Sequence, residues 1–140
     1  MKKKLAIVGA IVIIIGVAFV LAMQMQPRKP DEDTLIFDGD SKKGFIVDIA
    51  IQENDSVLYI GSVLLKDSKP TLENVLQTIN DSNEGVDISI DNNGNIIQIN
   101  DTKNTNEHRW CIYIDNKKLE ENSVKKIYVN ENDGITLTYE

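Results

Sequence analysis

The side chains best suited to metal or nucleophilic chemistry are one histidine, His108, and one cysteine, Cys111. A zinc site needs several cysteine or histidine ligands at set spacings, and a single residue of each type cannot supply them. The sequence also has no Gly-x-Ser-x-Gly motif and no glycine-rich phosphate loop. We therefore predict a protein that is not an enzyme and that holds no metal and no cofactor. His108 is expected in a surface loop, and Cys111 in the core in preference to acting as a reactive thiol.

Turns rich in Asp and Asn invite a calcium interpretation. In one of them, Asp91, Asn93 and Asn95 have the spacing of the first three ligands of an EF-hand loop. Ile96, however, occupies the position at which that loop requires glycine. Asp and Asn are also common in turns, because their side chains hydrogen-bond the nearby backbone. Turn formation is therefore the preferred interpretation of these residues.

A ligand groove, if the domain has one, is expected beside the segment that contains the only tryptophan. Trp110 shares one face of a predicted strand with Ile112 and Ile114, so packing in the core is its preferred role. Tyr113 lies on the opposite face and is expected to be half exposed. Together with Asn116 in the turn that follows, Trp110 and Tyr113 are the candidate ligand-binding residues.

One helix is predicted among the strands that must position these residues. Leu72, Val75, Leu76 and Ile79 fall at i, i+3, i+4 and i+7, which places them on one face of a helix. Thr71 precedes them and is a favourable N-cap, because its hydroxyl can accept a free backbone N–H. The polar run that follows ends in glycine and is expected to stop the helix.

The remaining apolar residues alternate in the way that predicts β-strands. The first two strands are expected to form a hairpin. The second, residues 57–65, is apolar on both faces, which indicates a central strand covered from both sides or a strand twisted into the core. An Asn-Gly pair at 93–94 predicts a tight turn between two later strands. Residues 35–37 could form a short strand or belong to a stalk. The predicted strands are residues 45–52, 57–65, 86–90, 95–99, 110–115 and 135–139.

This order of elements predicts an α+β fold: a β-grasp-like two-layer domain with a mixed sheet and one packed helix. The resemblance to a known family starts here. Four segments, in the same order, resemble those of transcobalamin C-terminal-like domains, and they are residues 70–76, 95–100, 110–117 and 132–139. The resemblance covers residues 44–140. It departs from the family where Asn-Lys stands in place of the usual Asn-Gly, at 116–117, and where Asp-Gly reverses the usual Gly-Asp, at 133–134.

The resemblance implies a β-grasp-like domain without catalytic activity, as found in extracellular vitamin B12 carriers and in bacterial surface proteins. In the carriers, this domain contacts cobalamin together with a separate helical domain. A chain of 140 residues is not expected to have room for that second domain. Cobalamin binding is therefore less expected than binding of another ligand or partner.

The N-terminal residues predict export. After three lysines, eighteen residues from Leu5 to Ala22 include no charged or strongly polar side chain. A helix of that length measures about 27 Å, close to the hydrocarbon thickness of a bilayer. We expect residues 1–23 to form an uncleaved, single-pass signal anchor in the cell membrane, with the N-terminus in the cytoplasm. Cleavage after Ala22, as in a signal peptide, would instead give a secreted protein.

The rest of the chain is predicted to be a polar linker, residues 24–43, and one domain, residues 44–140. Residues 31–140 contain 10 basic and 22 acidic side chains, a net charge of −12. Such a domain repels nucleic acid and anionic lipid, so no nucleic-acid partner is expected. We predict a membrane-anchored, extracytoplasmic binding or interaction module for a cell-surface protein or a small-molecule ligand. The alternative is a structural spacer or an accessory subunit of a membrane complex.

Overall fold

The computed structural model describes residues 33–140. Within this range, no helix is both long enough and apolar enough to cross a membrane. The predicted transmembrane segment, Leu5 to Ala22, lies outside the described residues, and so do the predicted cleavage site and the first part of the predicted linker.

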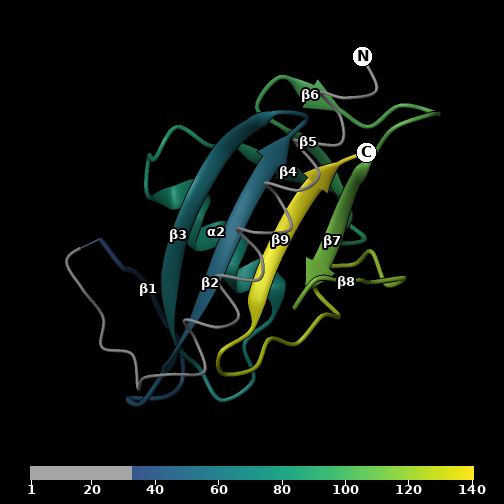
Figure 1. The fold of residues 1–140 in the computed structure, drawn as a ribbon. Helices are drawn as coiled ribbons and strands as arrows, with labels where there is room; N and C mark the ends of the chain where they lie inside the picture. The colour runs from purple at the N-terminus through teal and green to yellow at the C-terminus, as the bar shows by residue number, and fades with distance from the viewer. Residues whose placement is uncertain (1–32) are drawn as a thin grey trace.

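The described residues form strands and one helix, with the bounds β1 Leu35–Asp38, β2 Phe45–Glu53, β3 Ser56–Lys66, α2 Leu72–Asp81, β4 Ile88–Ile90, β5 Ile96–Ile99, β6 Thr102–Lys103, β7 Trp110–Ile114, β8 Lys117–Lys118 and β9 Gly134–Tyr139 (Figure 1). The large sheet has the order β1-β3-β2-β9-β7-β8. It is mixed, because β1 runs parallel to β3 and β2 runs parallel to β9. A second, antiparallel sheet has the order β4-β5-β6.

This architecture confirms the predicted α+β class with a mixed sheet and one helix. The predicted hairpin is also confirmed, because β2 and β3 pair antiparallel along their length. Residues 35–37 belong to β1, which pairs with β3. The folded domain therefore begins inside the segment that was predicted to be a linker, residues 24–43.

The expectation of a single sheet is wrong, because β4, β5 and β6 form a sheet of their own. The side chain of Asn80, near the end of α2, occupies the outer edge of β4. Its amide nitrogen donates to the Ile88 C=O at 2.8 Å, and its amide oxygen accepts from the Ile88 N–H at 2.6 Å. The outer edge of β4 is thus closed by the helix.

β2 is the central strand that is covered on both faces. Ile49 is fully buried on one face, and Asp48 is only 2% exposed on the other. The prediction that residues 57–65 form this doubly covered strand is wrong, since Ile60 of β3 is 47% exposed. β1 pairs only with residues 63–66 of β3, so the first part of β3 lies at the edge of the sheet.

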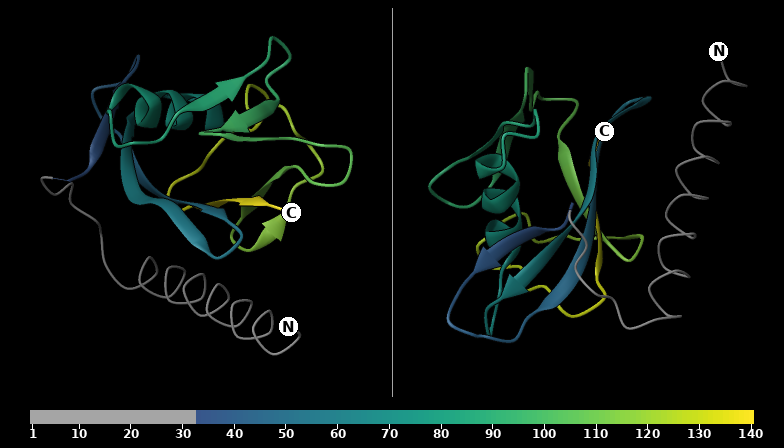
Figure 2. Two further views of the ribbon diagram at one scale, coloured as in Figure 1. Left: turned by 90° about the horizontal axis from the view of Figure 1, so that it is seen from above. Right: turned by 90° about the vertical axis from the view of Figure 1, so that its left-hand side faces the viewer.

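α2 begins where the sequence predicts it. Thr71 is the N-cap, and its backbone N–H donates to the side-chain oxygen of Asn74 at 2.8 Å. Figure 2 shows α2 and the small sheet on the same side of the large sheet, so the core lies between these two layers. The predicted apolar face of the helix is fully buried there and consists of Leu72, Val75, Leu76 and Ile79.

The long connection between β8 and β9 packs against the start of the helix instead of forming a regular strand. The first N–H of α2 donates to the Ile127 C=O at 2.8 Å, and the Val129 N–H donates to the Pro70 C=O at 3.0 Å. Ile127 and Val129 are both buried. The connection therefore contributes to the core and ties α2 to the chain that enters β9.

Candidate functional site

One edge of β7 is only partly covered by a neighbouring strand. β9 pairs with β7 from Trp110 to Ile114, but β8 pairs only with Tyr113 and Ile114. In a strand, the N–H and C=O groups of alternate residues point to the same edge. Trp110 and Ile112 therefore present their backbone groups to the edge that faces away from β9.

Two of these four backbone groups are hydrogen-bonded. The Trp110 N–H donates to the side-chain oxygen of Asn104 at 2.8 Å, and the Ile112 C=O accepts from the Leu119 N–H at 2.9 Å. The Trp110 C=O and the Ile112 N–H lie between these two bonds, on a part of the edge where none of the described strands pairs. A short stretch of sheet edge is thus left open.

A cavity of about 350 Å³ lies on each side of this open stretch. Trp110 and Ile112 line the first cavity, whereas Cys111 lines the second. Successive side chains of a strand project from opposite faces, so the two cavities lie on opposite faces of the sheet. We call them the inner and the outer cavity, and together with the open edge they form the β7 groove. The inner cavity is also lined by Asn95, Ile96, Asn104 and Thr105, the outer cavity by Lys118, Leu119 and Glu120, and both by Arg109 and Asn122.

Asn104 holds one wall of the groove in place by joining the small sheet to β7. Its amide nitrogen donates to the Ile96 C=O at 2.8 Å, while its amide oxygen accepts from the Trp110 N–H at 2.8 Å. The indole N–H of Trp110 donates to the Thr102 C=O at 3.0 Å. Trp110 is therefore fixed from both its backbone and its ring, and it is 4% exposed.

The opposite wall depends on the turn between β4 and β5. Gly94 has a φ of +88°, a conformation that suits glycine because it has no Cβ. The Gly94 C=O accepts from the Val124 N–H at 2.8 Å, and the Ser123 hydroxyl donates to the Asn93 C=O at 2.7 Å. These bonds fix the segment that carries Asn122 beside the groove.

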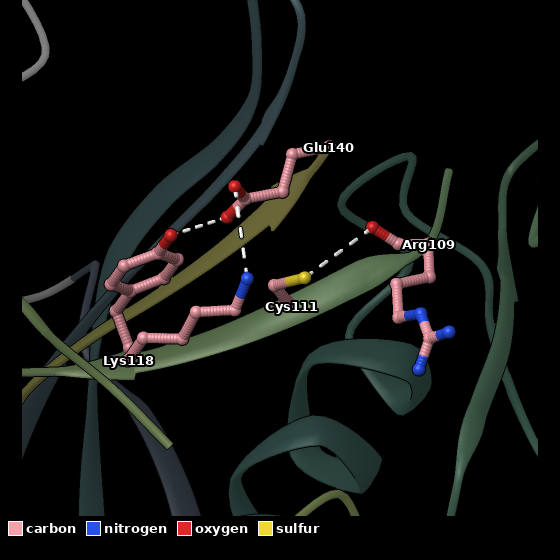
Figure 3. A network of polar contacts seen from close by, with 5 residues as sticks. Arg109, Cys111, Lys118 and Glu140 are labelled. Atoms are coloured by element: carbon pink, nitrogen blue, oxygen red, sulfur yellow. Dashed lines mark hydrogen bonds and ion pairs between the residues drawn. The ribbon is translucent and has the colours of Figure 1, made fainter. Parts of the chain in front are cut away.

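Arg109 supplies a positive charge at the groove. Within residues 33–140, its guanidinium makes no ion pair and no hydrogen bond. The Lys118 ammonium, by contrast, lies 3.9 Å from a carboxylate oxygen of Glu140. Figure 3 shows the Arg109 guanidinium pointing away from this pair. In a domain with an excess of acidic residues, Arg109 is thus a cation that remains available to a ligand.

Glu140 also binds the hydroxyl of Tyr113, which donates a hydrogen bond to its carboxylate. This hydrogen bond, assisted by partial burial and by the negative charge of Glu140, raises the pKa of Tyr113 to about 12. Tyr113 is therefore neutral across the physiological range and serves as a hydrogen-bond donor on the outer face of the sheet.

Of the three predicted ligand-binding residues, only Trp110 lines the groove. Its buried position and the partly exposed position of Tyr113 are as predicted. Asn116 lies at the tip of the turn between β7 and β8, next to Asp115, with φ values of 66° and 51° respectively. Two successive positive φ values are typical of a two-residue hairpin, so Asn116 has a role in the turn.

The other residues weighed for chemistry have structural positions. His108 is exposed in the loop before β7, and its ring stacks on Tyr139 with 6.0 Å between the centroids. Cys111 is 5% exposed, so it is buried as expected, but on the outer face of the sheet and not in the core between the layers; its thiol donates to the Arg109 C=O at 3.7 Å. In the described part of the chain, no group of three or more His, Cys, Asp or Glu side chains could hold a metal ion.

Asp91 forms a turn, as the preferred interpretation of the sequence requires. One of its carboxylate oxygens accepts from the Asn95 N–H and from the Asn93 N–H, each at 2.9 Å. The bond from the Asn95 N–H is the main cause that holds the pKa of the Asp91 carboxyl below its usual value. The aspartate thus stays charged and closes the turn that supports the groove.

Of the residues that line the groove, only Trp110 was predicted to bind a ligand, and those missed include Arg109, Asn104 and Asn122. Each lies in a polar connection that reads as a surface loop. They meet only because β7 passes beside the small sheet and the connection after β8 returns to the turn at Gly94. The one feature of the sequence that could have indicated this site is Arg109, a basic residue directly before the strand of Trp110 in an acidic domain.

Comparisons with known proteins identify no family for this chain. No protein-family model matches the sequence, and no curated protein matches it. One similar solved structure is a "putative metal binding protein" from Ruminococcus gnavus ATCC 29149, with 17% sequence identity and a TM-score of 0.49. The match covers 69% of this chain and 96% of that one.

Proposed function

We propose that the protein is a membrane-anchored, extracytoplasmic binding or interaction module without catalytic activity. The observation that carries this proposal is the β7 groove, in which an open sheet edge lies between two cavities. The groove combines backbone donors and acceptors with a tryptophan and a few polar side chains, and binding sites are typically built in this way. The guanidinium of Arg109, which is unpaired within residues 33–140, adds a charged contact for a ligand or partner.

The anchored location is supported by the sequence. The apolar run from Leu5 to Ala22 follows three lysines and is long enough to span a bilayer. The lysines favour a cytoplasmic N-terminus, so the domain would lie outside. Its net charge of −12 over residues 31–140 disfavours contact with anionic lipid. A partner protein or a soluble ligand is therefore the proposed target.

A relation to transcobalamin C-terminal-like domains and a β-grasp-like fold are part of the proposal. They are supported by the four sequence segments and by the mixed sheet, in which a strand of the first hairpin, β2, pairs in parallel with β9 while α2 packs on one face. Corrinoids are therefore one ligand class to test at the groove.

Membrane fractionation tests the anchor. The full chain is expected to stay in membranes after carbonate extraction at high pH, and an external protease is expected to digest the domain in intact cells. Recovery of the chain in the soluble fraction, or protection from the external protease, would contradict the anchored extracytoplasmic location.

Site-specific photo-crosslinking in living cells tests the binding role. A photo-reactive phenylalanine analogue replaces Asn122, which lines both cavities, and in a matched control it replaces Lys126, which is exposed and lines neither. A crosslinked partner is expected from position 122 and not from position 126. Equal crosslinking from both positions would argue against the groove as the binding surface. Crosslinks from position 126 alone would favour the role of a spacer or accessory subunit.

A further inference from the structure

The open edge of β7 has the backbone pattern that accepts an added strand. The Trp110 C=O and the Ile112 N–H face the groove, and they are separated along the strand by Cys111, whose backbone pairs with β9. An acceptor and a donor at alternate residues are what one more strand would bond. The same edge is already used in this way further along, where β8 pairs with Tyr113 and Ile114.

The two cavities match the side chains of such a strand. Successive side chains of an extended peptide project to opposite faces. A peptide that pairs with Trp110 and Ile112 would place one side chain in the inner cavity and the next in the outer cavity. Peptide recognition by strand addition combines backbone bonds for affinity with pockets for alternate side chains, which give specificity.

The boundaries of the open edge limit the length of the peptide. Asn104 occupies the edge at one end, because its side chain binds the Trp110 N–H, and the Leu119 N–H closes the other end by binding the Ile112 C=O. Only a short extended stretch fits between them. The exposed side chain of Asn122 borders both cavities, so the peptide would also meet an amide there.

The charges beside the groove favour a carboxylate on the peptide. Arg109 borders both cavities, and its guanidinium has no partner within residues 33–140. Lys118 and Glu120 also line the outer cavity, and Lys118 is engaged by Glu140. Arg109 is thus the cation that a ligand can engage, and the guanidinium group binds carboxylates with two parallel hydrogen bonds.

We infer that the β7 groove binds a short extended peptide segment of a partner protein by adding it as a strand beside Trp110 and Ile112, with a carboxylate of the peptide on Arg109. This inference rests on the proposed function and names the class of partner. The groove would then recognise the backbone of a peptide and would not be a site for a cofactor-like small molecule.

Fluorescence of Trp110, the only tryptophan, tests the inference directly. The full chain in detergent micelles is titrated with positional libraries of acetylated tetrapeptides that end in a free carboxylate. At least one library is expected to change the emission in a saturable manner, because Trp110 lines the inner cavity. No saturable change with any library would overturn strand addition.

Two modified forms of the best peptide separate its contacts. Methylation of the peptide nitrogens removes the donors that would reach the Trp110 C=O, and is expected to abolish binding. Replacing carboxylates by amides is expected to weaken binding about tenfold, as loss of a charge-assisted hydrogen bond does. Equal binding of the methylated peptide would overturn strand addition, and equal binding of the amide would overturn the role of the carboxylate.

Matched protein variants locate the contact. Arg109→Gln is expected to weaken binding of the acid peptide about tenfold and to leave binding of the amide unchanged. Lys126→Gln, which removes an exposed charge outside the groove, is expected to change neither. If Lys126→Gln weakens binding as much as Arg109→Gln, general electrostatics explains the effect and the assignment to Arg109 is overturned.

The outcomes also distinguish this inference from the proposed function. A crosslinked partner at position 122 without any peptide binding would overturn strand addition and leave the interaction module standing. Peptide binding by a chain that fractionates as soluble would overturn the membrane location and support the groove.

Discussion

Replacing Gly94 with alanine is expected to disturb the wall of the β7 groove that carries Asn122. The φ of Gly94 is +88°, and a left-handed conformation costs a residue with a Cβ roughly 1–2 kcal/mol. A Cβ at this position would also collide with the Ser123 hydroxyl oxygen. The hydroxyl must then move, and its 2.7 Å bond to the Asn93 C=O is lost. Loss of such a bond costs about 0.5–1.5 kcal/mol.

Gly85 provides a matched control. Its φ is +81°, but no atom lies within 4 Å of an added Cβ. Gly85→Ala therefore measures the cost of the left-handed backbone conformation without a steric clash. Alanine also reduces the conformational entropy of the unfolded chain, which stabilises the folded state by about 0.4–1 kcal/mol. We therefore expect a loss of about 1 kcal/mol for Gly85→Ala and of about 2 kcal/mol for Gly94→Ala.

Urea unfolding of the full chain in detergent, followed by the fluorescence of Trp110, measures both free energies. Ser123→Ala completes a double-mutant cycle. Once the hydroxyl is absent, Gly94→Ala should add only the conformational term, so the two substitutions are expected to fall short of additivity by about 1 kcal/mol. Equal destabilisation by the two glycine substitutions, with strict additivity in the cycle, would refute the steric explanation.

Three further predictions concern the core, the acidic turns and the outer face. Leu76→Ala removes a fully buried side chain of α2 and is expected to lower the free energy of unfolding by about 2–5 kcal/mol in the same urea assay. The N–H and hydroxyl of Ser68 donate to Asp40 and lower its pKa, so Asp40→Asn should destabilise the fold near neutral pH, and the effect should vanish as the pH falls below about 4. A constant effect of Asp40→Asn across that range would contradict this. Glu140→Gln should lower the pKa of Tyr113 from about 12 towards 10.0 in a spectrophotometric titration, and an unchanged value would show that the carboxylate is not its cause.

The elements with a local signal could be predicted from the sequence. The apolar spacing of Leu72 to Ile79 and the cap at Thr71 depend on residues within a few positions, and both are found in α2. The same holds for the β2–β3 hairpin and for the alternation that buries Trp110 and Ile112. Local sequence also predicted the tight turn at 93–94, where Gly94 has a positive φ.

Pairing between distant segments could not be predicted in this way. The apolar character of residues 57–65 suggested a central strand, but the neighbours decide burial, and β1 covers only the last part of β3. The separate small sheet was not predicted either, and the outer edge of its strand β4 is bonded by the Asn80 side chain of α2. The groove likewise depends on where β8 ends, and nothing near Arg109 or Asn122 in the sequence specifies that.

The parallel pairing of β2 with β9 determines when the domain can complete its fold. Asp48 lies opposite Gly134 and Glu53 opposite Tyr139, so the centre of the sheet joins segments that are far apart in the chain. Contacts of this kind close a long loop and slow folding. During synthesis, the β2–β3 hairpin is made early, but one edge of β2 stays unpaired until β9 has been added. If the domain is exported as proposed, the pairing of β9 with β2 would be completed only on the far side of the membrane.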